Sequence, residues 1–460
     1  MHLLNRIIPT VALAAALFSP YSLSAQSKDP GPKPLRFNPN IPPMLPGAAA
    51  SDANLFPAAL QAFLQGNSVN GTLVGPTGVP FQGVGLGPRF NHFGCSNCHR
   101  VPFAGGASYI SNSQAALASG TLTDYGVQAP GQTAPAFLKT SGPTLAARLK
   151  YKADGTRDGA MYPIWTISGR SDAPGCAIPQ VDWNAELAKN NVAIRITTPT
   201  LGAGLIEAIL DSAIMANKVA GSAIKLMLGI QGHENRNTID ASISKFGWKA
   251  QTRTLRDFSA DAFRNEIGVT NDGAISENDS TPSCNFHPGL EDTPVTTPNG
   301  PMLRTDLVTH LMRFLAPPTP AAPTASSNNG QALFASTGCA QCHTASLPTA
   351  ANATPAIFAN KQVPLYSDLL LHRMGAGLAD DIIQGQAGPD EFRTAPLWGL
   401  GQRFYLLHDG RTVDLKAAIA AHASAPANGF PASEANAVVG KWNALGETQK
   451  QDLLNFLRSL

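Results

Sequence analysis

Two copies of one pentapeptide constrain this chain more than any other feature of its sequence. They are Cys95-Ser96-Asn97-Cys98-His99 and Cys339-Ala340-Gln341-Cys342-His343. A Cys-x-x-Cys-His run is the attachment pattern of c-type haem, in which each Cys forms a thioether with one former vinyl group of the porphyrin. The His that follows supplies an imidazole nitrogen to the iron. The sequence therefore predicts two covalently bound haem c groups, with His99 and His343 as iron ligands.

Paired cysteines also allow two other interpretations. A zinc site would need the two pairs to converge on one metal ion. A thioredoxin-like dithiol would need a βαβ context around the pair. The sequence favours haem over both.

The first 25 residues have the features of an export signal. Arg6 precedes a short apolar stretch, 7–18, and a run of small residues precedes Gln26, where we expect cleavage. A buried N-terminal helix is the alternative. Export would place the chain in the oxidising periplasm, where Cys176 and Cys284 are expected to form a disulfide. A Cys thiolate bound to iron is the other interpretation of these two residues.

The composition excludes several classes of protein. With 33 basic and 31 acidic residues the formal net charge is only +2, and no dense Lys/Arg stripe is present to bind a nucleic acid. Hydrophobic residues make up 43% of the chain, which argues against intrinsic disorder. Beyond the signal, no stretch reaches about 18 uninterrupted apolar residues, so we expect no membrane span in the mature chain.

A predicted closing helix follows each motif at a distance. Apolar positions share one helical face in Asp306 to Leu315 and again in Gln451 to Leu460. Residues 316–329 are rich in Pro, Ser and Asn, which is typical of a linker that is first semi-rigid and then flexible. We therefore expect a mainly α, loop-rich fold with two cytochrome c-like haem domains, the first enlarged by insertions. The expected organisation is signal 1–25, Pro-rich segment 26–50, first domain 51–315, linker 316–329 and second domain 330–460.

Five further blocks are spread over both halves of the chain: Gly85–Asn91, Phe246–Ala250, Leu365–Leu370, Phe392–Leu400 and His408–Gly410. In this order they resemble the di-haem oxidoreductase family of the bacterial di-haem cytochrome c peroxidase superfamily. The resemblance implies a pair of mainly helical cytochrome domains in the periplasm. It also implies reduction of hydrogen peroxide or another small oxidant, with a small soluble cytochrome or copper protein as electron donor. A calcium ion between the domains is a further expectation.

The resemblance extends to single positions near the first haem. Trp248 resembles the aromatic residue between the two haems of the peroxidases and of the methylamine-utilisation enzyme, where it would mediate electron transfer. A core Trp bonded to a carbonyl is the alternative. Phe258 stands where the peroxidases carry an active-site Gln, which is a departure from the family pattern. Glu266 is the nearest carboxylate that could act as catalytic acid or base, and an exposed helical Glu is the alternative.

The second haem is expected to have a sixth ligand, because two strong axial donors limit rearrangement when the iron changes oxidation state. His422 is the first choice, since it shares a helical face with Leu415 and Ile419. It could instead interact with the helix dipole at a C-terminus. Met374 is the alternative ligand, and His372 is expected to form structural hydrogen bonds.

No sixth ligand stands out for the first haem among His92, His233, His287 and His310. An open axial position is what a peroxide-binding iron requires. A loop folding over the haem is the alternative. The sequence therefore predicts peroxide reduction at the first haem with electrons relayed through the second. A thiol, sulfur-compound or protein-modifying oxidoreductase on the same scaffold, or a non-enzymatic electron-transfer cytochrome, are the competing hypotheses.

Overall fold

The structure, a computed structural model, describes most of the chain: residues 26–33, 42–71, 83–117, 133–167, 175–284 and 289–460. The predicted export signal lies outside these residues. So do His287 and part of the Pro-rich segment.

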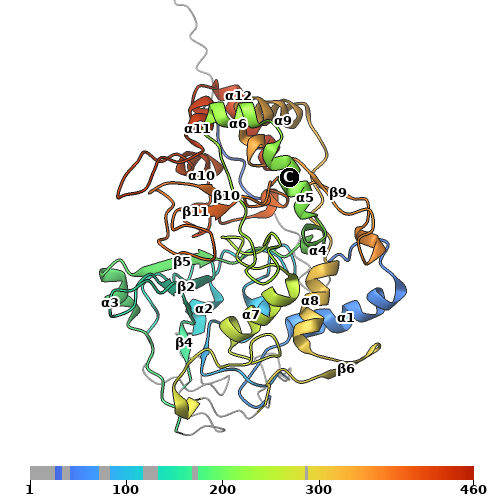
Figure 1. The fold of residues 1–460 in the computed structure, drawn as a ribbon, viewed down its shortest axis with the longest axis vertical. Coiled ribbons are helices and arrows are strands. Elements are labelled where there is room, and N and C mark those ends of the chain that lie inside the picture. The colour runs from blue at the N-terminus through green and yellow to red at the C-terminus, as the bar shows by residue number, and fades with distance from the viewer. Residues whose placement is uncertain (1–25, 34–41, 72–82, 118–132, 168–174, 285–288) are drawn as a thin grey trace, which may run out of the picture.

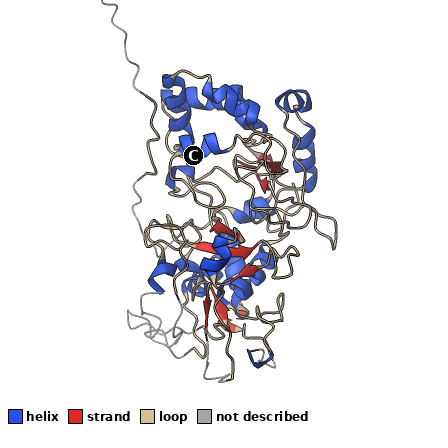
Figure 2. Cartoon of the chain, turned by 90° about the vertical axis from the view of Figure 1, so that its left-hand side faces the viewer, coloured by secondary structure: helices blue, strands red, loops and turns tan. Residues whose placement is uncertain are grey.

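Within the described residues, twelve α-helices are joined largely by loops, as Figures 1 and 2 show. The helices are α1 (Ala50–Leu64), α2 (Ser113–Ala116), α3 (Trp183–Ala188), α4 (Ala203–Glu207), α5 (Asp211–Val219), α6 (Ser222–Leu228), α7 (Leu255–Ile267), α8 (Arg304–Phe314), α9 (Ala325–Thr337), α10 (Leu415–Ala421), α11 (Asn436–Asn443) and α12 (Glu447–Leu457). This helical, loop-rich character agrees with the prediction.

Short antiparallel strands complete the fold. The largest sheet has the order β3-β2-β5, and in it Leu145 pairs with Ile196. Alternate residues of β2 and β5 are buried, which is the period-2 pattern of a half-buried strand. The strands are β1 (Arg89–Phe90), β2 (Leu145–Leu149), β3 (Met161–Tyr162), β4 (Trp165–Thr166), β5 (Val192–Ile196), β6 (Val295–Thr297), β7 (Gly300–Met302), β8 (Leu347–Pro348), β9 (Gln362–Val363), β10 (Leu371–Arg373) and β11 (Glu391–Arg393).

Two main apolar clusters hold the molecule together. The larger is built around α1, α7 and α8, and the smaller around α9, α10 and α12. The two predicted closing helices are therefore present as α8 and α12. Leu365, Leu369 and Leu370 follow the second motif in sequence, yet they pack into the larger cluster. The C-terminal part of the chain thus contributes to the core that supports the first motif.

The second half of the predicted linker is not flexible. Residues 326–329 form the first turn of α9, because Thr324 and Ser327 make a reciprocal capping box at its N-terminus. Gly330 then packs so closely on α12 that a Cβ there would lie 2.0 Å from the carbonyl oxygen of Asp452. Tight packing of the two helices therefore orders this segment.

Two segments that precede the linker lie against the C-terminal helices. Figure 1 shows α6 beside α9, α11 and α12, and Leu228 of α6 packs in one cluster with Cys339 and Cys342. Near the start of the described chain, Asp29 forms a buried ion pair of 2.7 Å with Arg458. Both contacts connect the two halves of the sequence.

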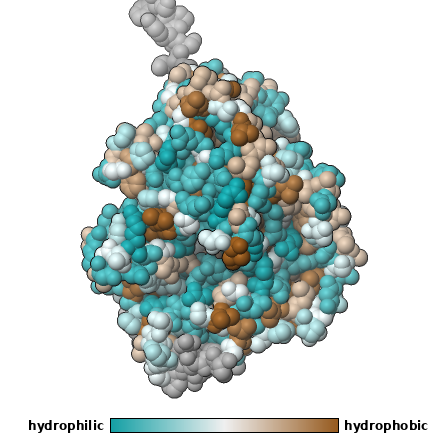
Figure 3. Space-filling model, in the orientation of Figure 1, coloured by the Kyte–Doolittle hydropathy of each residue, from teal (hydrophilic) through white to brown (hydrophobic). Residues whose placement is uncertain are grey.

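Cys176 and Cys284 form a disulfide, as predicted, although they are 108 residues apart in sequence. None of the helices in the described part of the chain is long and apolar enough to span a membrane. On the face in Figure 3 the surface is mainly hydrophilic, with apolar side chains in scattered patches.

Candidate functional site

Each pentapeptide folds into the same short turn beside a cavity. Residues Cys95–Asn97 and Cys339–Gln341 form 3-10 helices, and the backbone N–H of His99 and of His343 donates to the first Cys carbonyl of its motif. All four cysteines are free thiols. The first motif lines a cavity of about 160 Å³, called the first cavity below. The second motif lines a cavity of about 240 Å³, called the second cavity.

The cysteine environment does not suit zinc. Burial raises the pKa of the Cys95 and Cys98 thiols to about 12, so the thiolate that zinc requires is disfavoured. Among the described residues, the one cluster of three possible metal-binding side chains is Cys342, Asp368 and His372, which includes a Cys of only one motif. A neutral sulfur, such as that of a thioether, fits these positions better.

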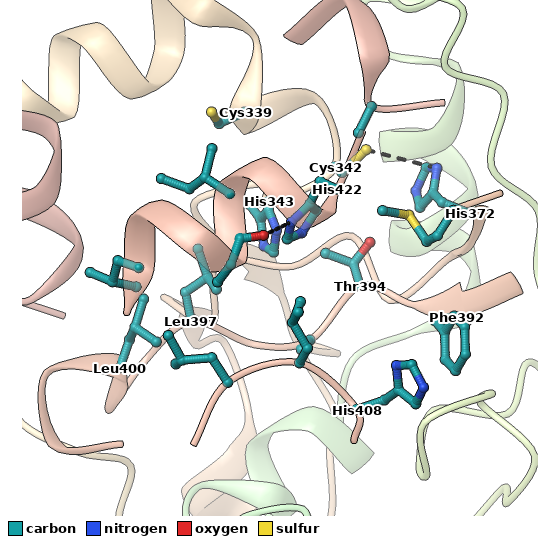
Figure 4. A pocket seen from close by; sticks show the side chains of 18 of the residues that line it. Cys339, Cys342, His343, His372, Phe392, Thr394, Leu397, Leu400, His408 and His422 are labelled. Atoms are coloured by element: carbon teal, nitrogen blue, oxygen red, sulfur yellow. Dashed lines mark hydrogen bonds between the residues drawn. The ribbon is translucent and has the colours of Figure 1, made fainter. Parts of the chain in front are cut away.

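Two imidazoles in the second cavity present a free nitrogen. His343 Nδ1 donates to the carbonyl oxygen of Tyr366 at 3.0 Å, and His422 Nδ1 donates to that of Ala418 at 2.7 Å. In each ring Nε2 is left as the acceptor that iron can use. Burial lowers the pKa of both residues, to about 4 for His343, so both rings are neutral. Figure 4 shows the two side by side among the lining residues.

His422 lies where α10 ends, so both interpretations of this residue have a structural basis. Leu415 and Ile419 line the second cavity with it, which confirms the shared helical face. Its contact with the Ala418 carbonyl also satisfies an acceptor of the last helical turn. Met374 lines the same cavity. The choice of His422 over Met374 as sixth ligand therefore stays a prediction.

His372 forms the structural hydrogen bonds expected of it. Its Nε2 lies 3.0 Å from Asp368 Oδ2 and its Nδ1 lies 2.8 Å from Glu434 Oε2. Burial disfavours the protonated ring, but the neighbouring Asp368 carboxylate acts against burial, and the pKa of His372 lies well above its ordinary value. His372 is thus held as a cation between two carboxylates beside the second motif.

Trp248 borders both cavities. Its indole Nε1 donates to the carbonyl oxygen of Ile196 at 2.9 Å, and Ile196 also lines both cavities. The ring of His408 meets the indole edge to face, with centroids 6.3 Å apart. The two interpretations of Trp248 therefore hold together: the indole is bonded to a backbone carbonyl and also lies between the cavities of the two motifs.

Helix α7 supplies one wall of the first cavity. It carries Phe258, Asp261 and Glu266, all of which line that cavity. Glu266 is not an exposed helical residue, because it is half-buried in the wall of the first cavity and accepts a hydrogen bond of 2.7 Å from Asn91 Nδ2. Burial raises the pKa of the Glu266 carboxyl above its ordinary value. A carboxyl of this kind is suited to exchanging a proton inside the cavity.

The histidines considered for the two axial positions of the first haem differ in their surroundings. Burial lowers the pKa of His99 to about 4, so its ring is neutral. His233 pairs with Glu391, and His310 contacts a backbone carbonyl of α1. His92 does line the first cavity, and its buried Nε2 has no hydrogen-bond partner among the described residues. The open axial position therefore stays a prediction, with His92 as the residue that could close it.

The family model described as "Di-haem oxidoreductase, putative peroxidase" matches residues 124–460. The chain belongs to this family. Membership implies haem cofactors and shows that the protein is a peroxidase-like oxidoreductase, as the sequence blocks predicted. No curated protein matches the chain significantly.

Three solved structures show weak similarity to this di-haem oxidoreductase. A hydrazine synthase of Kuenenia stuttgartiensis is 17% identical, with 35% of this chain and 57% of that chain covered and a TM-score of 0.23. A MauG-like protein associated with microbial copper homeostasis is 15% identical over 57% of this chain and 89% of its own, with a TM-score of 0.29. The diheme peroxidase BthA of Burkholderia thailandensis is 15% identical over 47% and 65%, also with a TM-score of 0.29. The match thus spans little more than half of the hydrazine synthase chain.

The two cavities of this di-haem oxidoreductase fit its expected cofactors. Each offers two neutral sulfurs and a neutral imidazole from one motif, and the second has apolar walls that include Phe334, Leu400 and Leu453. When haem is bound, His99 and His343 are placed to hold the irons and the cysteines to hold the porphyrins.

Sequence reasoning did not single out three of the arginines that line the two cavities. Arg148 of β2 lines the first cavity, and Arg393 and Arg403 line the second. Arg393 falls inside a block that carries the family resemblance, which was a usable signal. Arg148 had only the alternating pattern of a short strand, and that pattern does not indicate a cavity.

Proposed function

We propose that this protein is a periplasmic di-haem cytochrome c that reduces hydrogen peroxide at the first haem with electrons relayed through the second. Cys95 and Cys98 would hold one porphyrin by thioethers, and Cys339 and Cys342 the other. The position of Trp248 on both cavities is the observation that carries this proposal. A relay between two centres needs such a group, whereas two independent haem sites would not.

Reduction of one peroxide to two waters consumes two electrons and two protons. The bound haem supplies an iron that binds peroxide and accepts electrons one at a time. Glu266 would act as general base and then acid, taking a proton from one peroxide oxygen and returning it to the other. Asn91 keeps the carboxyl in place through the 2.7 Å hydrogen bond to Oε2, which leaves Oε1 for the substrate.

The electron path follows from the fixed position of Trp248. The hydrogen bond of 2.9 Å to the Ile196 carbonyl holds the indole ring at the border of the two cavities. His343 and His422 would hold the second haem by two strong donors, which suits a centre that stores and passes electrons. The donor would be a small soluble cytochrome or copper protein, bound through a small transient interface near the second haem.

Electron paramagnetic resonance of the resting and half-reduced protein tests this proposal directly. We expect one reactive high-spin haem that changes on addition of peroxide and one low-spin haem. Peroxide turnover with a reduced cytochrome donor should accompany these signals. Two low-spin signals that ignore peroxide would contradict the proposal and would favour an electron-transfer cytochrome, with His92 closing the first site.

The role of Trp248 has its own variant. Trp248→Phe should slow electron transfer between the haems and lower peroxide turnover, while the spectrum of each haem stays unchanged. Trp183→Phe is the matched control, because Trp183 is buried but lines neither cavity. Equal loss of turnover in both variants would remove Trp248 from the electron path.

Phe258 favours a second candidate function. An apolar ring lines the first cavity where the family's peroxidases carry an amide. A thiol, sulfur compound or protein side chain could replace peroxide as the substrate on the same scaffold. Turnover of such compounds, with no turnover of peroxide, would favour this alternative.

A further inference from the structure

We propose that Arg393 and Arg403 bind the two propionates of the second haem, so that this edge of the porphyrin faces Trp248. The proposal rests on the proposed attachment of a haem at Cys339 and Cys342. It assigns two binding residues and an orientation within the second cavity.

Arg393 is buried and Arg403 is half-buried, and every acceptor their guanidinium groups use is a backbone carbonyl. Arg393 Nε donates to Gly247 O at 3.0 Å and its Nη1 to Thr394 O at 3.4 Å. Arg403 Nη2 donates to the carbonyls of Pro396 and Trp398 at 2.9 and 3.2 Å. A guanidinium has five N–H donors, so each group retains donors for another partner.

Neither guanidinium has a carboxylate within 4.0 Å among the described residues. Burial lowers the pKa of each to about 10, and repulsion from Arg403 adds to the effect on Arg393. Asp368 acts on Arg393 in the opposite direction, but its carboxylate is already paired with His372. A buried and a half-buried guanidinium side by side without a counter-ion are costly, which indicates that an anion binds between them.

The cavity defines where that anion lies. Arg393 and Arg403 line the second cavity, and no other Arg or Lys of the described chain does so. Both also line a smaller cavity of about 50 Å³ shared with Trp248. They therefore sit at the side that faces the first motif.

The attachment cysteines lie at the other side of the second cavity. Cys339 and Cys342 pack against Leu228 of α6 and Val438 of α11. Figure 4 places these two cysteines at one end of the view and Phe392 and His408 at the other. Arg393 follows Phe392 directly in sequence.

The chemistry of haem c matches this layout. Its two thioether-bearing groups and its two propionates lie on opposite edges of the porphyrin. Attachment at Cys339 and Cys342 therefore directs both carboxylates toward the arginines. Two carboxylates meet two guanidinium groups, whose planar forks suit carboxylate geometry.

Potentiometric titration of the holoprotein tests the assignment without turnover of any substrate. In Arg393→Gln and in Arg403→Gln, loss of a positive charge should favour the oxidised second haem. At a fixed applied potential the ratio of reduced to oxidised second haem should fall about tenfold for each variant, for a charge roughly 10 Å from the iron at an effective dielectric constant of about 20. The potential should also become more dependent on pH between 5 and 8, because the propionates lose the cations that keep them ionised.

Arg411→Gln is the matched control, since Arg411 is exposed and already paired with Asp409. Arg393→Lys and Arg403→Lys keep the positive charge, so they should restore most of the ratio of reduced to oxidised second haem. They also remain usable if the Gln variants do not fold. The propionate-bending bands in resonance Raman spectra should move in the Gln variants only. The assignment would be overturned if the Gln variants of Arg393 and Arg403 changed the ratio of reduced to oxidised haem no more than Arg411→Gln does. Unmoved propionate-bending bands in these variants would also overturn it. These measurements need no peroxide. They therefore distinguish failure of the propionate assignment from failure of the proposed peroxide reaction.

Discussion

At the residue scale, burial sets the protonation state of the groups at both cavities. Burial lowers the pKa of His343 and His422 and keeps their rings neutral, as iron ligation requires. Burial acts in the opposite direction on Glu266, whose carboxyl has a raised pKa. One physical cause thus favours neutral imidazoles at the second cavity and the protonated carboxyl of Glu266 at the first.

Glu266→Gln should lower kcat/KM for peroxide by roughly 10²- to 10⁴-fold, because an amide cannot accept the proton. The base form of Glu266 is populated only above its raised pKa, so the activity of the unmodified protein should fall as pH drops through a value above the ordinary Glu pKa. The pH profile of kcat/KM measures both effects. Glu186→Gln, on α3 and away from the first cavity, is the control and should change neither. An acid limb that survives in Glu266→Gln would contradict the assignment.

His422→Met should raise the reduction potential of the second haem, because a Met/His pair of axial ligands raises the potential relative to two His ligands. Potentiometric titration with optical detection measures the shift. Met374→Leu should leave the potential nearly unchanged if His422 is the ligand. An unchanged potential in His422→Met, with a large change in Met374→Leu, would transfer the assignment to Met374.

At the element scale, close packing of α9 on α12 orders the segment that leads into the second motif. The capping box at Thr324 begins α9, and the missing side chain of Gly330 lets the backbones approach. The helix ends at Thr337 and the motif begins two residues later, at Cys339. The position of the second Cys-x-x-Cys-His motif therefore depends on this helix pair.

Gly330→Ala should lower the free energy of unfolding by about 1–3 kcal/mol, because its Cβ would overlap the Asp452 carbonyl. Chemical denaturation followed by circular dichroism measures the change. Gly440→Ala is the matched control, since Gly440 is an exposed position of α11 with nothing within 4 Å of the added Cβ. That control should be neutral or stabilising by up to about 1 kcal/mol. Equal effects at both positions would show that helix packing is not the cause.

At the scale of the whole molecule, a buried ionic cluster joins the two halves of the chain. Asp380 Oδ2 accepts from Arg195 of β5 at 2.6 Å, and its Oδ1 lies 3.1 Å from Lys249 Nζ. Arg195 lines the first cavity and Lys249 follows Trp248 in sequence. The cluster therefore supports the region where the two cavities meet.

Asp380→Asn should lower the free energy of unfolding by about 3–5 kcal/mol, because it leaves two buried cations without their carboxylate. Although burial opposes ionisation, the Arg195 and Lys249 charges hold the pKa of Asp380 below its ordinary value. Its contribution is therefore present above the unfolded pKa and is lost as pH falls through the folded pKa. Unfolding measured from pH 7 down to pH 3 should show this loss in the unmodified protein only. Asp240→Asn, in the exposed pair with Arg253, should change stability by less than about 1 kcal/mol.

Several parts of the fold were accessible from local sequence patterns. The apolar period of about 3.6 residues identified α8, α12 and the helix before His422. The short strands were missed, because two to five alternating residues carry little signal without their partners. The order in residues 326–329 was missed for the same reason, since it comes from contact with α12.

The sequence by itself determined where haem can be attached, because a Cys-x-x-Cys-His run holds its chemistry within five residues. Family membership followed from blocks whose order is also readable along the chain. Only the tertiary structure decided that Glu266 is half-buried, that Trp248 borders both cavities, and that neither Arg393 nor Arg403 has a carboxylate within 4.0 Å among the described residues. Burial and charge pairing depend on residues brought together from distant parts of the chain, so no local pattern could have specified them.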